Sequence, residues 1–219
     1  MYRLRAEFCK GEEIRYIGHL DILRTLERAL RRAELPVART QGFNPRQKIA
    51  FASPLPVGIT GERELVDMEF DSEISPDSFL QRINSALPTG MRFSHACGIA
   101  IGGPSLMADL DQAEYLARWH ETLADGLEPL LELFLQQDEI FILRRSKKGE
   151  RRLNIRPAVL QLKDGGSRCD DIRLLMCLKL SGEVTAKPNE VMEALREISG
   201  LKIEAPLLTR LEVKLSHRK

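Results

Sequence analysis

Hydrophobic and polar residues alternate with two different periods in the first part of the chain. Leu4, Ala6 and Phe8 alternate with charged residues, and this period of two predicts a half-buried strand. Residues 18–34 then carry leucines at helical spacing, which predicts a helix with one hydrophobic stripe facing a core. The predicted stripe consists of Leu20, Leu23, Leu26 and Leu30.

The rest of the first half predicts three extended segments and a second helix. Residues 36–52 look extended but are interrupted by glycine and proline, as in a strand with a bulge or a loop. Residues 66–70 alternate as a further strand, and residues 91–99 form another. Between them, Ser75 followed by Pro76 is typical of a helix start, because serine caps the helix and proline fits its first turn.

The same series of elements recurs after an offset of 112 residues. Residues 2–8 fall on residues 114–120, a candidate strand, and Pro76 falls on Pro188, which begins another helix that ends at Gly200. The other elements expected in the second half are a helix at 127–136, a hairpin at 140–163, and strands at 172–180 and 209–215.

Two successive βαββαβ series predict two tandem ferredoxin-like domains. We therefore expect an α+β fold with two antiparallel sheets, each with helices on one face. The first domain is expected at residues 1–102 and the second at residues 103–219, with the Gly/Pro-rich stretch 98–110 at the joint. RNA-recognition motifs share this topology and stack bases on aromatic residues of the central strands. Here the central strands of the first domain expose charges that we expect to pair across the sheet. These residues are Arg3, Arg5, Glu7, Asp67 and Glu69.

Charge is segregated along a chain whose total is nearly neutral. The 219 residues include 33 Lys/Arg and 32 Asp/Glu. Residues 1–50 carry a net charge of +5 (11 basic and 6 acidic), residues 103–143 carry −8 (1 and 9), and residues 144–156 carry +6 (7 and 1). Such segregation predicts an oriented electrostatic surface, unless the fold interleaves these segments.

Several classes of protein are disfavoured by the sequence. No run approaches 18 apolar residues, and the N-terminal residues lack the apolar core of a signal peptide, so we expect a cytoplasmic protein without a membrane partner. The four cysteines form no C-x-x-C pair, which favours thiols over a metal site, and we expect no cofactor. Because motifs such as G-x-S-x-G and H-E-x-x-H are also missing, the sequence identifies no catalytic constellation and favours a non-enzyme.

A cationic helix followed by a basic loop is the strongest functional signal. Arg24, Arg28 and Arg31 lie one turn apart on the first helix. Positive charge beside a loop rich in backbone donors suits a polyanion such as RNA, whereas the alternative is a solvated helix and turn. Phe43 either stacks on a base or anchors the loop to the core. The candidate loop residues are Arg39, Gln41, Gly42, Phe43, Asn44, Arg46 and Lys48.

Two further candidates are a basic hairpin and a histidine. The hairpin either wraps a phosphate backbone or is an exposed segment kept soluble by its charge. His19 opens the first helix, where it shuttles protons in RNA cleavage, or else caps the helix N-terminus or packs beside Asp21. The basic hairpin residues are Arg144, Arg145, Lys147, Lys148, Arg151, Arg152 and Arg156.

The run HLDILRTLERALRRAELPVARTQGFNPRQKIAFASPLPVGITGERELVDMEF resembles the radical SAM-linked proteins, a bacterial-type family of unknown activity found alone or fused behind a radical SAM enzyme domain. The resemblance is specific across residues 3–70 and weaker towards the C-terminus, and it implies a helper of a radical SAM enzyme, acting on RNA. The chain has Gly18 where that family favours serine, and Asn154 where it often has aspartate. It lacks the C-x-x-x-C-x-x-C cluster motif, so it is not itself the radical enzyme.

The tandem layout also resembles the CRISPR repeat-processing endoribonucleases, which place a histidine near the first helix. His19 matches that position, but the late segment SGLKIEAPLLTR has one glycine where those enzymes carry a glycine-rich loop. The leading hypothesis is therefore an RNA-binding or substrate-presenting module that works with a radical SAM enzyme in RNA modification or processing. The alternatives are a metal-independent endoribonuclease that uses His19, and a protein-interaction scaffold whose arginines dock an acidic partner.

Overall fold

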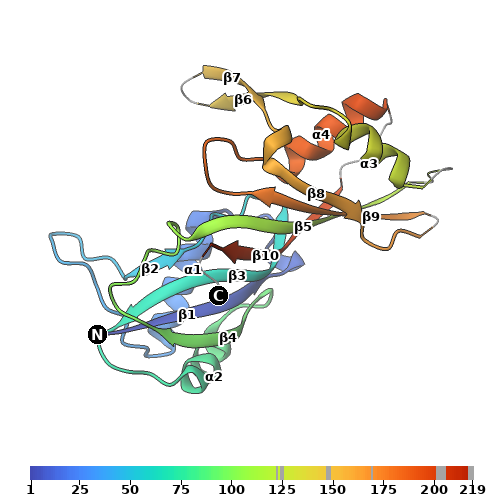
Figure 1. Cartoon of the computed structure of the whole chain (residues 1–219). Coiled ribbons are helices and arrows are strands. Elements are labelled where there is room, and N and C mark those ends of the chain that lie inside the picture. The colour runs from blue at the N-terminus through green and yellow to red at the C-terminus, as the bar shows by residue number, and fades with distance from the viewer. Residues whose placement is uncertain (122, 124–125, 147–148, 169, 201–205, 217–219) are drawn as a thin grey trace. The chain divides into compact units, whose positions relative to one another are not determined.

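A computed structural model describes residues 1–121, 123, 126–146, 149–168, 170–200 and 206–216 of the chain (Figure 1). The chain divides into two compact units, Met1–Leu110 with Leu215–Lys219, and Asp111–Lys214. We describe each unit separately.

In the first unit, four strands pair antiparallel with one another and two helices pack against them. The strand order is β4-β1-β3, and the short strand β2 pairs with β3. Strand β1 is antiparallel to both neighbours, with Leu4 opposite Met68 and Ala6 opposite Val66. The elements are β1 (Tyr2–Lys10), α1 (His19–Arg32), β2 (Ile49–Phe51), β3 (Ile59–Phe70), α2 (Pro76–Ala86) and β4 (Met91–Ile99), with a 3-10 turn at Glu12–Ile14.

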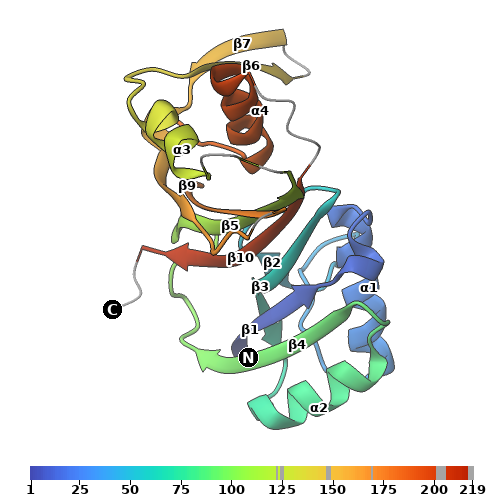
Figure 2. The same cartoon turned by 90° about the vertical axis from the view of Figure 1, so that its right-hand side faces the viewer.

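Helices α1 and α2 cover one face of this sheet (Figure 2). The alternating residues of β1 that were predicted to be buried meet apolar side chains of both helices there. Phe79 of α2 lies between two aromatic rings, with ring centroids 6.1 Å from Phe70 and 5.4 Å from Phe93. Helix α2 begins as predicted, because Ser75 accepts a hydrogen bond from the Ser78 amide at 3.3 Å and proline follows.

The second unit has a sheet of order β10-β5-β9-β8 and a separate two-stranded sheet, β6-β7. Strand β9 is antiparallel to both β5 and β8. Helix α4 ends at Gly200, whose φ of 69° is left-handed, as the sequence predicts for a C-terminal glycine. The elements are β5 (Leu110–His120), α3 (Glu128–Leu135), β6 (Phe141–Ser146), β7 (Gly149–Asn154), β8 (Val159–Asp164), β9 (Asp171–Lys179), α4 (Pro188–Ser199) and β10 (Leu207–Leu215), with a 3-10 turn at Arg156–Ala158.

The structure confirms the expectation of a mixed helix-and-strand protein with mainly antiparallel strands. One detail of the predicted core is wrong. Leu20 is 64% exposed and Leu23 is only half-buried, whereas Ile22, which was not predicted, is buried beside Leu26 and Leu30. The described residues include no helix long and apolar enough to cross a membrane.

Candidate functional site

The GFNP loop, defined as residues 39–48, is a projecting loop with a fixed base. The Thr40 amide donates to the Arg46 carbonyl at 2.8 Å, and the Arg46 amide donates to the Thr40 hydroxyl at 3.0 Å. At the base, the Lys48 amide donates to the Ala38 carbonyl at 2.9 Å, and the Lys48 ammonium lies 2.6 Å from Glu69 on β3. These bonds tie both ends of the loop to the sheet and leave residues 41–46 in solvent (Figure 1).

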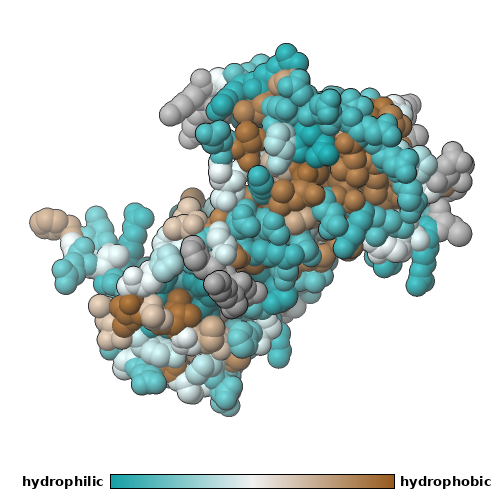
Figure 3. Space-filling model, viewed as in Figure 1, coloured by the Kyte–Doolittle hydropathy of each residue, from teal (hydrophilic) through white to brown (hydrophobic). Residues whose placement is uncertain are grey.

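Phe43 is fully exposed at the tip of this loop. It follows Gly42, whose φ of 128° is a backbone conformation that residues with a side chain rarely adopt. In Figure 3 the loop is a narrow, mainly hydrophilic projection with an apolar tip. The sequence left two roles open for Phe43, and the observed exposure contradicts the one in which it anchors the loop to the core.

The charges of the GFNP loop are only partly compensated. Arg39 and Arg46 are exposed, and neither forms an ion pair with any residue that the structure describes. Lys48, by contrast, is neutralised by Glu69, so it adds little to the field that a ligand would meet. The predicted loop cations therefore reduce to two arginines on either side of an exposed aromatic ring.

The arginines of α1 form a second cationic surface in the same unit. Arg24, Arg28 and Arg31 are all exposed on the side of the helix opposite the core, together with Leu20. Arg24 forms an exposed ion pair with Asp21 at 3.0 Å, whereas Arg28 and Arg31 have no ion-pair partner within the described ranges. The predicted arginine face of α1 thus exists, with two uncompensated charges on it.

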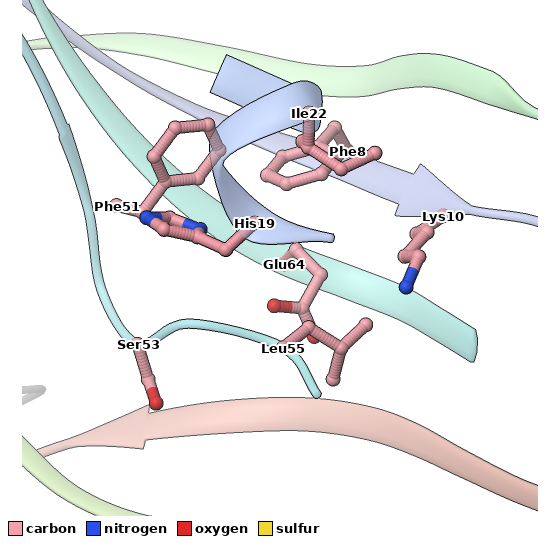
Figure 4. Close-up of a pocket in the computed structure, with 8 residues that line it drawn as sticks. All are labelled: Phe8, Lys10, His19, Ile22, Phe51, Ser53, Leu55 and Glu64. Carbon is pink, nitrogen blue, oxygen red and sulfur yellow. The ribbon is translucent and has the colours of Figure 1, made fainter. Parts of the chain in front are cut away.

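His19 lines a small pocket at the start of α1 (Figure 4). Its ring meets the edge of the Phe51 ring at a centroid distance of 5.1 Å, and burial lowers the pKa of the imidazole below its usual value. His19 forms no side-chain cap on α1, and Asp21 bonds Arg24 instead. The pocket has a volume of about 10 Å³, enough for one water, and is lined by Phe8, Lys10, His19, Ile22, Phe51, Ser53, Leu55 and Glu64.

Two buried charges lie in this pocket that the sequence reasoning missed. Lys10 is 2% exposed and Glu64 is 3% exposed. The Lys10 ammonium donates to the Arg15 carbonyl at 2.8 Å. Gly61 makes room for Glu64, because a Cβ on this glycine would lie 2.7 Å from the Glu64 Cγ. A signal was available, since Lys10 continues the core-facing alternation of β1 into a position where a charge is unusual.

The basic hairpin of the second unit is largely engaged within the fold. Arg144 donates to Glu190 at 2.6 and 2.8 Å, and Arg145 lies 2.7 Å from Glu150. Arg152 stacks over the ring of Phe141, with its guanidinium carbon 4.0 Å from the centroid. Among the described cations of strands β6 and β7, the exposed Arg151 is therefore the one with neither an ion pair nor an aromatic contact. Lys147 and Lys148 lie outside the described residues.

Arg156 holds the segment after the hairpin to α3. Its guanidinium donates to the main-chain carbonyls of Leu135, Gln137 and Val159, each at 3.2 Å. The Asn154 side-chain oxygen accepts from the Ile140 amide at 3.0 Å and from the Arg156 amide at 3.1 Å. An aspartate can accept the same two bonds, so this position needs an acceptor for structural reasons. Arg156 was predicted to bind RNA, but its bonds are those of a residue that fixes a chain segment.

The fold and these surfaces define a mixed α/β protein with an exposed basic loop in its first unit. The model of a bacterial family matches residues 3–188, most of the chain. The chain belongs to this family, which is described as an uncharacterized protein conserved in bacteria (DUF2344). Comparison with curated proteins found no match.

Proposed function

We propose that the protein binds RNA through the GFNP loop. The observation that carries this proposal is the fully exposed Phe43 between Arg39 and Arg46, on a loop whose base is held by hydrogen bonds. A base that stacks on an exposed aromatic ring gains about 1–3 kcal/mol, and this gain tolerates any base because every base has a π-face. The two arginines then hold neighbouring phosphates, and Gln41, Gly42 and Asn44 shape the loop that presents the ring.

The rest of the first unit supports this choice of surface. We propose that each unit is a ferredoxin-like domain. The strand orders β4-β1-β3-β2 and β10-β5-β9-β8 support this view, because in each set of four the first and third strands along the chain are neighbours. RNA-recognition motifs of that topology stack bases on the open sheet face. In this protein Arg3 and Arg5 both bind Asp67 on that face, at 2.7 and 2.8 Å. Charged pairs offer no surface on which bases can stack. The GFNP loop and the arginine face of α1 are therefore better candidates for the RNA-binding surface than this sheet face.

We also propose that the bound RNA is presented to a radical SAM enzyme. The support for this partner is the resemblance of residues 3–70 to radical SAM-linked proteins, together with the absence of a cluster motif in the chain itself. In this role the protein supplies affinity and position, and the partner supplies the chemistry.

The proposal is tested by crosslinking RNA to the native protein, sequencing it, and measuring the affinity of the recovered sequence by fluorescence anisotropy. We expect Phe43→Ala to weaken binding by about tenfold, the loss of one stacked base. The double variant R39A/R46A should weaken it further at low salt. The matched control is Arg92→Ala, which removes an exposed arginine from β4 of the same unit. Affinity unchanged in Phe43→Ala, or lowered equally by Arg92→Ala, contradicts the proposal.

A second candidate function is RNA cleavage with His19 as the general base. The observation that favours it is the position of His19 in a pocket with Ser53 and the buried Glu64 (Figure 4). Because burial lowers its pKa, the imidazole is neutral at pH 7 and able to accept a proton. Incubating total RNA with the wild type and with His19→Ala tests this function, and equal background degradation by both contradicts it.

A third candidate is a scaffold whose arginines bind an acidic protein. The same exposed Arg28 and Arg31 support it, since guanidinium groups pair as well with carboxylates as with phosphates. Purification of the native protein after nuclease treatment distinguishes the scaffold from RNA binding. An acidic partner protein that is retained without RNA favours the scaffold.

A further inference from the structure

A groove in the second unit lies between strand β6 and helix α4, whose neighbouring positions Figure 2 shows. Its volume is about 570 Å³, within the range of sites that bind small molecules or peptide side chains. It belongs to a different unit from the GFNP loop and uses different residues. It is lined by Phe141, Ile142, Leu143, Arg145, Glu190, Glu193, Ala194 and Glu197.

The position of β6 beside α4 is fixed by one arginine. Arg144 makes two hydrogen bonds to Glu190 in the first turn of α4, and a third to the Thr185 carbonyl at 2.8 Å. Glu190 also accepts from the Lys187 amide at 2.9 Å, which caps the helix. A two-pronged arginine–carboxylate pair that is largely shielded from solvent fixes geometry as well as adding energy. The groove is therefore a preformed feature and not a gap between independent segments.

The strand side of the groove is apolar and open to solvent. Leu143 is 56% exposed and Phe141 is 40% exposed, although both are large hydrophobic side chains. Arg152 stacks on Phe141 and supports the ring in this position. Exposed apolar side chains that gather at a concave site are typical of binding surfaces, because a partner that covers them removes apolar area from water.

The helix side of the groove is acidic. Glu193 and Glu197 lie one turn apart on α4, both are exposed, and neither forms an ion pair with the residues that the structure describes. The other charges that line the groove are compensated, Glu190 by Arg144 and Arg145 by Glu150. Two carboxylates therefore remain to meet a ligand. Their charge repels phosphate groups and attracts cations, so RNA does not suit this groove.

We propose that the groove docks a basic amphipathic segment of a partner protein. Apolar side chains of that segment pack on Phe141 and Leu143, and its lysine or arginine side chains pair with Glu193 and Glu197. The complementarity is twofold, apolar against the strand and positive against the helix. The protein then has two separate binding surfaces, one for a polyanion in the first unit and one for a cationic peptide in the second.

The test uses two synthetic amphipathic peptides with identical leucine spacing, one with lysine and one with glutamate at the polar positions. Binding of each labelled peptide to the full chain is measured by fluorescence anisotropy. We expect the leucine–lysine peptide to bind and the leucine–glutamate peptide not to bind. The double variant E193K/E197K should weaken binding of the leucine–lysine peptide by about tenfold or more, because both rim charges are reversed.

The matched control is the double variant E128K/E132K, which reverses two exposed glutamates one turn apart on α3 of the same unit. This control should bind the leucine–lysine peptide like the wild type. Leu143→Ser, an exposed change that leaves the Arg144–Glu190 pair intact, should also weaken binding. The proposal is overturned if the leucine–lysine peptide does not bind, if it binds the groove variant and the control equally, or if both peptides bind alike. Self-association of the chain that E193K/E197K abolishes would assign the groove to a second copy and overturn it too.

Discussion

The Arg5 guanidinium donates two hydrogen bonds to the Asp67 carboxylate, of 2.8 and 3.0 Å. Arg3 binds the same carboxylate at 2.7 Å, and the Asp67 side chain is only 3% exposed. The hydrogen bond to Asp67 is the main cause of a raised pKa for Arg5. One largely buried carboxylate on β3 thus neutralises two guanidinium groups on β1.

Replacing Asp67 by asparagine should destabilise the protein by about 3–5 kcal/mol, because it leaves two shielded guanidinium groups without their counter-ion. Urea unfolding followed by circular dichroism measures the loss. Asp71→Asn is the control, because Asp71 directly follows β3, is exposed, and should tolerate the change. Equal stability of the two variants would show that the Arg3–Asp67–Arg5 cluster contributes nothing to the fold.

Much of the fold could be predicted because local rules determine it. The alternation of Leu4 and Phe8 on β1 follows from the period of a strand, and the boundaries of α2 and α4 follow from Ser75 and Gly200. The error at Leu20 arose because this residue lies on the arginine side of α1, opposite the buried Ile22, and leucine spacing alone does not fix the centre of the buried face.

The candidate sites were less predictable because they depend on contacts between distant segments. The basic residues of the hairpin are adjacent in sequence, but whether each is free depends on partners such as Glu190, which belongs to α4. Likewise, the compensation of Lys48 by Glu69 requires the pairing of β2 with β3. The exposure of Phe43 depends on how far the GFNP loop projects, which no periodicity encodes. Chain-local charge counts therefore overestimated both cationic patches.

The salt dependence of RNA binding should report the two loop arginines. If Arg39 and Arg46 each neutralise one phosphate, the double variant R39A/R46A should reduce the slope of log K against log salt by about 2. Phe43→Ala should lower the affinity and leave this slope unchanged, because stacking releases no counterions. Affinities measured at several salt concentrations separate the two contributions, and a slope that the arginine variant shares with the wild type would remove both residues from the interface.

Gly61→Ala should destabilise the first unit by about 1–3 kcal/mol, the usual cost of overpacking. The added Cβ would lie 2.7 Å from the Cγ of Glu64, and this buried side chain has little room to move. Gly103→Ala is the matched control, because its nearest heavy atom would be 3.6 Å away. Thermal unfolding of both variants provides the comparison. A loss confined to Gly61→Ala would show that the pocket beneath His19 is tightly packed around its buried charges.

The free energy of unfolding should decrease as the pH is lowered, because His19 titrates. Burial lowers the folded-state pKa of this imidazole below the unfolded value of about 6.5. Between these two pKa values the unfolded chain binds more protons than the folded protein, so the free energy of unfolding decreases as the pH is lowered through that window. Well above the unfolded pKa of about 6.5 both states are neutral at this position, and the contribution is constant.

Urea unfolding of the wild type and of His19→Gln across pH 5 to 7.5 isolates this contribution, because glutamine keeps polarity near Phe51 without titrating. The wild type should lose more stability than His19→Gln as the pH falls, and an NMR titration of the His19 ring should give a midpoint below 6.5. Parallel pH profiles would mean that the ring titrates identically in the folded and unfolded chains. The pocket would then not favour a neutral imidazole, and the case for His19 as a general base would lose its physical support.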